Sequence, residues 1–110
     1  MGLFTRTTTT DATTLAARLG ARSVHVLDVR QPAEWRHGHI RGSQNLTLRQ
    51  LEGRLATLPR EKTIVTVCAS GHRSAAAARV LTRAGYRVEN LKGGMRAWTR
   101  ADLPVEKRRS

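Results

Sequence analysis

Residues 63–74 read TIVTVCASGHRS, and this stretch decides the fold. Its first five residues are all β-branched, a run typical of a buried strand. The residues from Arg73 to Leu81 are rich in alanine and predict a helix. The only cysteine, Cys68, therefore lies on a tight turn from a strand into a helix. In an open α/β sheet, that position is at the carboxyl ends of the strands, where ligands bind.

The predicted surroundings of Cys68 favour an anion. Backbone N–H groups of the turn and the helix N-terminus both attract negative charge, so we expect the thiol pKa to lie well below the free value of about 8.5. Gly71 permits the tight turn, and Arg73 can direct its guanidinium toward an oxyanion. The alternative interpretation is a buried core thiol, the usual environment of a free cysteine. The strand–turn–helix placement favours the reactive thiol.

Length and cysteine content limit the architecture and the compartment. A chain of 110 residues forms one domain. A single cysteine excludes an internal disulfide and favours a reducing compartment, so we expect a cytoplasmic protein. No apolar stretch approaches the roughly 20 residues that span a bilayer, and residues 1–10 lack the apolar region of a signal peptide.

The chain is strongly basic, with a formal net charge of +12 and 17 arginines among its 20 basic residues. The arginines are scattered through every segment, and aromatic residues that could stack on bases are few. We therefore do not expect nucleic acid as a partner. A positive field that draws small anionic substrates is the expected consequence.

Strand and helix patterns alternate along the chain. Strands are predicted at residues 7–10, 24–29, 45–46, 63–67 and 87–91. Helices are predicted at residues 12–19, 31–35, 48–58, 73–84 and 95–101. This alternation indicates an α/β fold with a parallel sheet covered by helices on both faces. Residues 106–110 are predicted to be a charged tail after a domain of residues 1–105.

Three blocks of sequence resemble the rhodanese (sulfurtransferase) family. They are, in chain order, Asp28-Val29-Arg30 with Glu34-Trp35, Gly38-His39-Ile40 and Asn45; Cys68-Ala69-Ser70-Gly71-His72-Arg73-Ser74; and Leu91-Lys92-Gly93-Gly94 with Trp98 and Leu103-Pro104-Val105. They span residues 28–105 in the family's order and near its spacing. One departure is Asp102, where a glycine is common, and we expect it to alter only the local turn.

The resemblance implies a single rhodanese-like domain with a five-stranded parallel sheet. It implies that Cys68 takes a sulfane sulfur from a donor, becomes a persulfide and passes the sulfur to cyanide or a thiol. This chemistry needs an exposed and activated nucleophile, and we expect neither a cofactor nor a metal. Thiosulfate, a thiol persulfide and a sulfur-carrier protein all remain candidate donors.

The resemblance also assigns the site residues. The substrate-binding loop comprises Ala69, Ser70, Gly71, His72, Arg73 and Ser74, and the supporting residues are Asp28, Arg30, Glu34, His39, Gly93 and Gly94. Asp28 and Arg30 end the second strand, and their functional interpretation is contact with the cysteine loop or the substrate. We favour a structural role, for example an ion pair of Arg30 with Glu34. His39 is expected to anchor the turn at 38–42, and His72 to face solvent and influence acceptor preference.

The two glycines have a separate expected role. Gly93 and Gly94 are expected to let the backbone approach the cysteine loop closely.

Two other functional classes stay open. Phosphatases and arsenate reductases of related fold place five residues between cysteine and arginine, whereas this chain places four. The smaller loop suits a sulfur atom better than a phosphoryl group. Non-catalytic rhodanese-like modules usually lack the cysteine that this chain has.

The charged residues 106–110 would also suit a junction to a membrane helix in a longer protein.

Overall fold

The computed structural model describes residues 8–108 and has one five-stranded sheet. The elements are β1 (Thr9–Thr10), α1 (Ala12–Arg18), β2 (Val24–Asp28), α2 (Pro32–His37), β3 (Gln44–Asn45), α3 (Leu48–Leu51), the 3-10 helix η1 (Glu52–Thr57), β4 (Thr63–Val67), α4 (His72–Arg83), β5 (Arg87–Leu91) and α5 (Gly94–Arg100). All strand pairs are parallel, in the order β1-β5-β4-β2-β3. The predicted α/β class and the five-stranded parallel sheet are confirmed.

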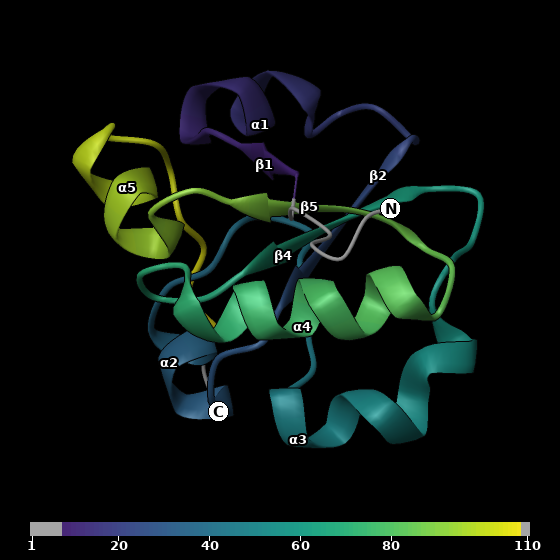
Figure 1. Cartoon of the computed structure of the whole chain (residues 1–110). Coiled ribbons are helices and arrows are strands. Elements are labelled where there is room, and N and C mark those ends of the chain that lie inside the picture. Colours follow the sequence, from purple (N-terminus) through teal and green to yellow (C-terminus); the bar gives the residue numbers. More distant parts are fainter. Residues whose placement is uncertain (1–7, 109–110) are drawn as a thin grey trace.

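Helices cover both faces of the sheet, as Figure 1 shows. Helices α1 and α5 lie on one face, over a cluster of buried residues that includes Leu15, Val65 and Trp98. Helices α3 and α4 lie on the other face, over a second cluster that includes Leu27 and Leu81. The central strand β4 is buried on both faces, which explains its continuous β-branched sequence.

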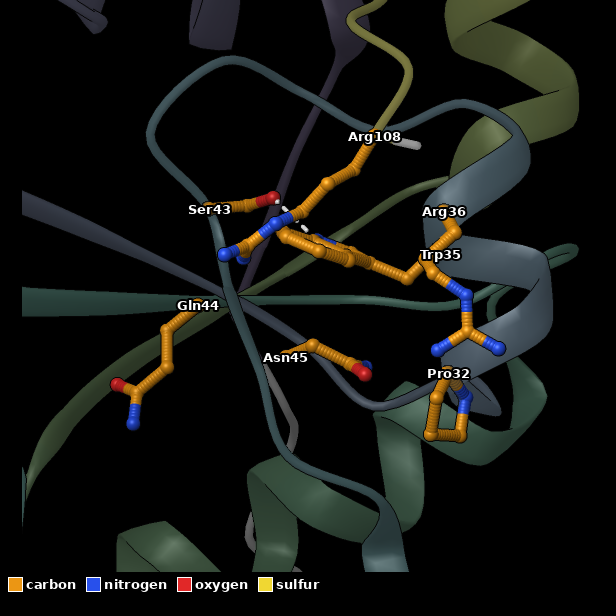
Figure 2. A pocket seen from close by; sticks show the side chains of 7 residues that line it. All are labelled: Pro32, Trp35, Arg36, Ser43, Gln44, Asn45 and Arg108. Carbon is orange, nitrogen blue, oxygen red and sulfur yellow. Dashed lines mark hydrogen bonds between the residues drawn. The ribbon is translucent and has the colours of Figure 1, made fainter. Parts of the chain in front are cut away.

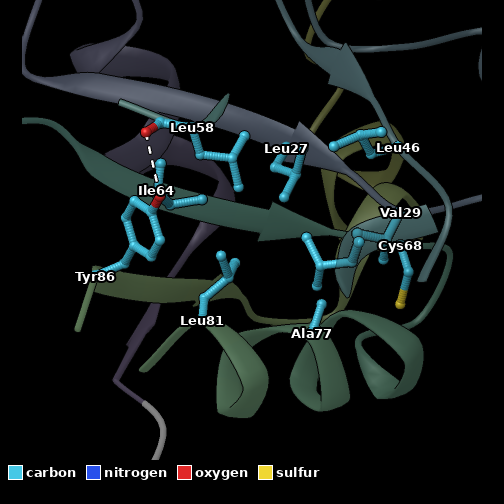
Figure 3. Packing of buried hydrophobic residues seen from close by; sticks show 10 residues of the cluster. Leu27, Val29, Leu46, Leu58, Ile64, Cys68, Ala77, Leu81 and Tyr86 are labelled. Carbon is cyan, nitrogen blue, oxygen red and sulfur yellow. Dashed lines mark hydrogen bonds between the residues drawn. The ribbon is translucent and has the colours of Figure 1, made fainter. Parts of the chain in front are cut away.

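The two-residue alternation of β4 determines which face Cys68 occupies. Ile64 belongs to the cluster beneath α4, whereas Val65 and Val67 belong to the opposite cluster. Cys68 continues this alternation and lies on the α4 face, next to Ala77 (Figure 3). The small alanine side chains of α4 allow this helix to pack close to the sheet at that point.

Most predicted elements lie where the sequence indicates. Strands β4 and β5 begin and end at the expected residues, and Asp11 caps α1 by accepting a hydrogen bond from the Thr14 N–H at 2.8 Å. Strand β3 lies one residue before the predicted 45–46. Thr7, predicted to begin the first strand, lies outside the described residues.

The helix predicted over residues 48–58 is wrong in its second half. The α-helix ends after one turn and continues as the 3-10 helix η1, which contains Gly53. Glycine has a low helix propensity, and 3-10 turns are common at helix C-termini. Leu58 is extended because it precedes Pro59, which disfavours the helical conformation. Leu58 is nevertheless buried, so the apolar stripe does face the core.

The segment after α5 returns to the domain. Asp102 has a φ of 59°, the left-handed conformation that explains why a glycine suits this turn and that aspartate tolerates. The predicted tail starts with Glu106, which exchanges two backbone hydrogen bonds with His39 at 2.8 and 2.9 Å. The Arg108 N–H then donates to the Arg36 carbonyl at 3.0 Å. No helix within residues 8–108 is long and apolar enough to cross a membrane.

Candidate active site

The turn between β4 and α4 depends on Gly71. This glycine is the N-cap of α4 and has a φ of 108°, a conformation that residues with a side chain rarely adopt. It turns the chain so that α4 begins at His72, with only three residues between Cys68 and the start of the helix. The loop thus presents its backbone N–H groups and the first turn of α4 to the cysteine sulfur.

Two donors contact the sulfur directly. The Gly71 N–H lies 3.0 Å from Cys68 Sγ, and the Ser74 hydroxyl lies 3.2 Å from it. Burial is the largest single influence on the thiol and raises its pKa. The hydroxyl of Ser74 and the N–H groups of Ser74, Gly71 and Ser70 lower it by more, so the pKa of Cys68 falls below its ordinary value. These groups favour the thiolate.

The sulfur is less accessible than the sequence indicated. Cys68 is only 1% exposed, whereas an exposed nucleophile was expected. The cause is the strand alternation, which directs its side chain beneath α4 and into a core cluster. Ser74, expected among the substrate-binding residues, is fully buried and bonds to the sulfur. A reactant must therefore enter the loop to reach the sulfur.

The N-terminus of helix α5, at Gly94, packs against the backbone of the cysteine loop. The Met95 N–H donates to the Cys68 carbonyl at 2.8 Å, and the Arg96 N–H donates to the Ala69 carbonyl at 3.0 Å. A Cβ atom on Gly94 would lie 2.7 Å from the Ala69 carbonyl oxygen, far inside contact distance. The close backbone approach expected at the glycine pair is present at this residue.

Sequence reasoning missed a buried polar pair beneath the loop. The Asn90 amide donates to the Gly71 carbonyl at 3.2 Å, and its oxygen accepts from the Thr66 hydroxyl at 3.2 Å. These residues face each other across β4 and β5. A polar residue at the carboxyl end of a buried strand is a signal that could have identified Asn90.

The ion pair after β2 differs from the expected one. Arg30 binds Asp28 through Nε at 3.0 Å and through Nη2 at 2.8 Å, and its Nη2 also donates to the Gly38 carbonyl at 2.7 Å. The predicted pair of Arg30 with Glu34 is therefore wrong. Asp28 and Arg30 lie two positions apart where β2 ends, so the two side chains emerge on the same side of the chain.

Glu34 pairs instead with Arg73. Its two carboxylate oxygens accept from Nη1 and Nη2 of Arg73 at 2.9 and 3.1 Å. The hydrogen bond from Arg73 is the main reason why the pKa of Glu34 falls to about 2, and the same bond raises the pKa of Arg73. The guanidinium expected to bind substrate is thus bound by a carboxylate of α2.

The two histidines of the motifs have different environments. His39 is buried, stacks on Trp35 with ring centroids 3.8 Å apart, and bonds to the Trp35 carbonyl at 2.7 Å. It therefore ties the turn to the end of α2. His72 is exposed, and its Nδ1 lies 3.1 Å from the Ser70 hydroxyl.

An open pocket of about 420 Å³ lies away from the cysteine loop, beside α2 and β3 (Figure 2). It is lined by Pro32, Trp35, Arg36, Ser43, Gln44, Asn45 and Arg108. Figure 2 shows the Arg36 and Arg108 guanidinium groups on different sides of this pocket. Within residues 8–108, no three His, Cys, Asp or Glu side chains gather as metal ligands would.

Comparison with known proteins assigns the family. The model of the rhodanese-like domain matches residues 11–101. The chain belongs to the rhodanese family. This match includes the cysteine loop and the buried Asp28–Arg30 pair, and the family relationship predicted from the three sequence blocks is confirmed.

Rhodanese relatives resemble the chain in sequence and in structure. A sulfurtransferase of Allochromatium vinosum is 37% identical over 97 residues, which cover 86% of this chain and 91% of that protein. The crystal structure of a rhodanese-related protein from Thermoplasma volcanium has a TM-score of 0.85 at 32% identity, covering 90% of this chain and 97% of that one. A thiosulfate sulfurtransferase from Pseudomonas aeruginosa has a TM-score of 0.82 at 36% identity; the match covers 96% of this chain and 20% of that chain. The relatives thus include sulfurtransferases.

Proposed function

We propose that the protein is a sulfurtransferase that carries a sulfane sulfur on Cys68. The observation that supports this most is the pair of hydrogen bonds to the Cys68 sulfur, from the Gly71 N–H at 3.0 Å and from the Ser74 hydroxyl at 3.2 Å. A core thiol needs no such donors, whereas a nucleophile held as a thiolate does.

The proposed reaction has two half-reactions. The Cys68 thiolate attacks the terminal sulfur of the donor, and the bond from that sulfur to the rest of the donor breaks. The leaving group departs with the bonding electron pair, as sulfite when thiosulfate is the donor. An acceptor thiolate or cyanide then attacks the outer sulfur of the persulfide, and Cys68 returns as a thiolate. No base is needed, because the attacking group is already deprotonated.

The loop backbone is the proposed anion site. The N–H groups that lower the Cys68 pKa can also stabilise the charge on a persulfide and on a leaving group. Ala69, Ser70 and His72 line the same turn and are proposed to contact donor and acceptor. The exposed ring of His72 is the proposed influence on acceptor preference, where a thiol or a sulfur-carrier protein would approach.

Phosphatase activity is a weaker candidate. The loop has four residues between Cys68 and Arg73, and both terminal nitrogens of Arg73 are bound by Glu34. The carboxylate occupies two of the five guanidinium N–H donors and neutralises the charge that would stabilise a phosphoryl group. A non-catalytic module is disfavoured by the presence of Cys68 and by its lowered pKa. The single thiol fits the reducing conditions of the proposed cytoplasmic location.

A steady-state assay tests the proposal. The purified protein is given thiosulfate or an organic persulfide, with cyanide or a thiol as acceptor, and p-nitrophenyl phosphate in a separate reaction. We expect sulfur transfer from at least one donor, loss of transfer in Cys68→Ser, and no phosphate release. Phosphate release that depends on Cys68, or transfer that survives Cys68→Ser, would overturn the proposal.

A further inference from the structure

Arg73, the cationic side chain of the cysteine loop, is bound by Glu34 from another helix. Arg73 lies in the first turn of α4, and Glu34 lies in α2, 39 positions earlier in the chain. Both terminal nitrogens of the guanidinium donate to the carboxylate, at 2.9 and 3.1 Å. This arrangement pairs the guanidinium charge with a carboxylate and occupies the two-nitrogen face that would otherwise bind an oxyanion in a bidentate manner.

The carboxylate of Glu34 is fixed by a second contact. Its Oε1 also accepts the Gln31 N–H at 3.0 Å, which forms the capping box of α2. Glu34 thus cannot move away from Arg73 without loss of a helix cap. The two side chains are 38% and 39% exposed, so the pair lies at the surface, where a donor can meet it. Pairs this exposed stabilise a fold little.

Arg73 and Asp28, two charged side chains beside the cysteine loop, each have a partner of opposite charge. Arg73 lies in the first turn of α4, directly before Ser74, whose hydroxyl is 3.2 Å from Cys68 Sγ. The charge of Cys68 raises the pKa of Arg73, in addition to the larger effect of Glu34. Asp28, which lies in register with Val67 directly before the cysteine, forms a second ion pair with Arg30. A dianion gains much from a free guanidinium, and little from one that is already neutralised.

We propose that Glu34 determines donor specificity by neutralising Arg73. The loop then favours sulfane sulfur donors with at most one negative charge, such as organic persulfides and thiosulfonates, over the thiosulfate dianion. This inference rests on the proposed function, and it assigns to Glu34 a positioning role that acts through Arg73. The net charge of +12 attracts all anions alike and is screened by salt, so it does not discriminate between these donors.

The test compares two donors that differ by one charge. Thiosulfate is a dianion, and benzenethiosulfonate carries the same terminal sulfur with a single charge. The measured quantity is the ratio of kcat/KM for thiosulfate to kcat/KM for benzenethiosulfonate, at low ionic strength. The variants are Glu34→Gln, which retains an oxygen for the Gln31 cap, Arg73→Ala, and the double variant.

We expect Glu34→Gln to raise the ratio about three- to ten-fold, because it frees the guanidinium charge. Arg73→Ala should lower the ratio by a similar factor, because it leaves Glu34 as an unpaired anion. The double variant is neutral again and should return to the wild-type ratio. The matched control is Glu89→Gln, which removes the carboxylate of a remote pair with Arg18 (2.7 Å) and should leave the ratio unchanged.

Other outcomes overturn the proposal in distinguishable ways. If Arg73 binds the donor itself, the double variant will have the low ratio of Arg73→Ala. If the pair only shapes the loop, all three variants will lose activity with both donors and the ratio will stay constant. If wild-type protein transfers sulfur from neither donor, the proposed function fails, and not only the role of Glu34.

Discussion

Two ion pairs flank the cysteine loop, and they differ chiefly in burial. The side chains of Asp28 and Arg30 are 1% and 8% exposed, whereas those of Glu34 and Arg73 are 38% and 39% exposed. A buried ion must keep its partner, because removal of one member leaves an uncompensated charge in the core. A half-exposed ion is partly solvated by water and can lose its partner at small cost. The buried pair of Asp28 with Arg30 can therefore stabilise the fold, whereas the exposed pair of Glu34 with Arg73 can adjust the electrostatics of the site.

The largest expected effect on stability is that of Asp28→Asn. The substitution leaves the Arg30 guanidinium buried without its carboxylate, so we expect the free energy of unfolding to fall by about 3–5 kcal/mol. Urea denaturation followed by circular dichroism measures the loss. A loss below about 1 kcal/mol would show that the buried pair is no more important than an exposed one.

Ser74→Ala and Glu34→Gln together test whether the Ser74 hydrogen bond or the exposed ion pair lowers the pKa of Cys68. The Ser74 hydroxyl is the strongest of the groups that lower the Cys68 pKa. We expect its removal to raise the pKa, and Glu34→Gln to leave the pKa closer to wild type. The measurement is the rate of alkylation by iodoacetamide against pH, with denatured protein as the reference.

The sign of the effect on stability follows from the lowered pKa. The folded state prefers the deprotonated Cys68, so this preference stabilises the fold fully above the unfolded pKa and is lost as pH falls through the folded pKa. An alkylation midpoint in the native protein at or above that of the denatured protein would show that the loop does not activate the sulfur.

The smallest expected effect is that of Glu34→Gln on stability. The pair is half exposed and the glutamine retains the cap, so we expect a loss of about 0–1 kcal/mol in the same urea experiment. Because the pKa of Glu34 is lowered to about 2, the contribution of the pair is complete above the unfolded value and disappears only as pH falls toward about 2. A loss as large as that of Asp28→Asn would contradict the distinction between the pairs.

The fold was predictable where local sequence dominates. The β-branched run of β4, the Gly71 turn and the alanine-rich α4 each carry their own signal, and together they locate Cys68. The helix over residues 48–58 was only half predicted, because the apolar spacing does not report the effects of Gly53 and Pro59.

Partners within the site were harder to predict than the elements. Glu34 lies four positions from Arg30 but binds Arg73, which is 39 positions away, and only the packing of α2 beside α4 brings the two together. The inward direction of the Ser74 hydroxyl likewise depends on where α4 begins. Side-chain pairing across elements is a tertiary property that no local pattern reports.

Mass spectrometry of the intact protein after incubation with a sulfane sulfur donor tests the central claim most directly. If Cys68 accepts the sulfur, the mass of wild-type protein will rise by one sulfur atom. The rise will disappear on addition of cyanide and will be absent in Cys68→Ser. A wild-type mass that stays unchanged with both thiosulfate and an organic persulfide would contradict the account, and Cys68 would then be a buried core thiol.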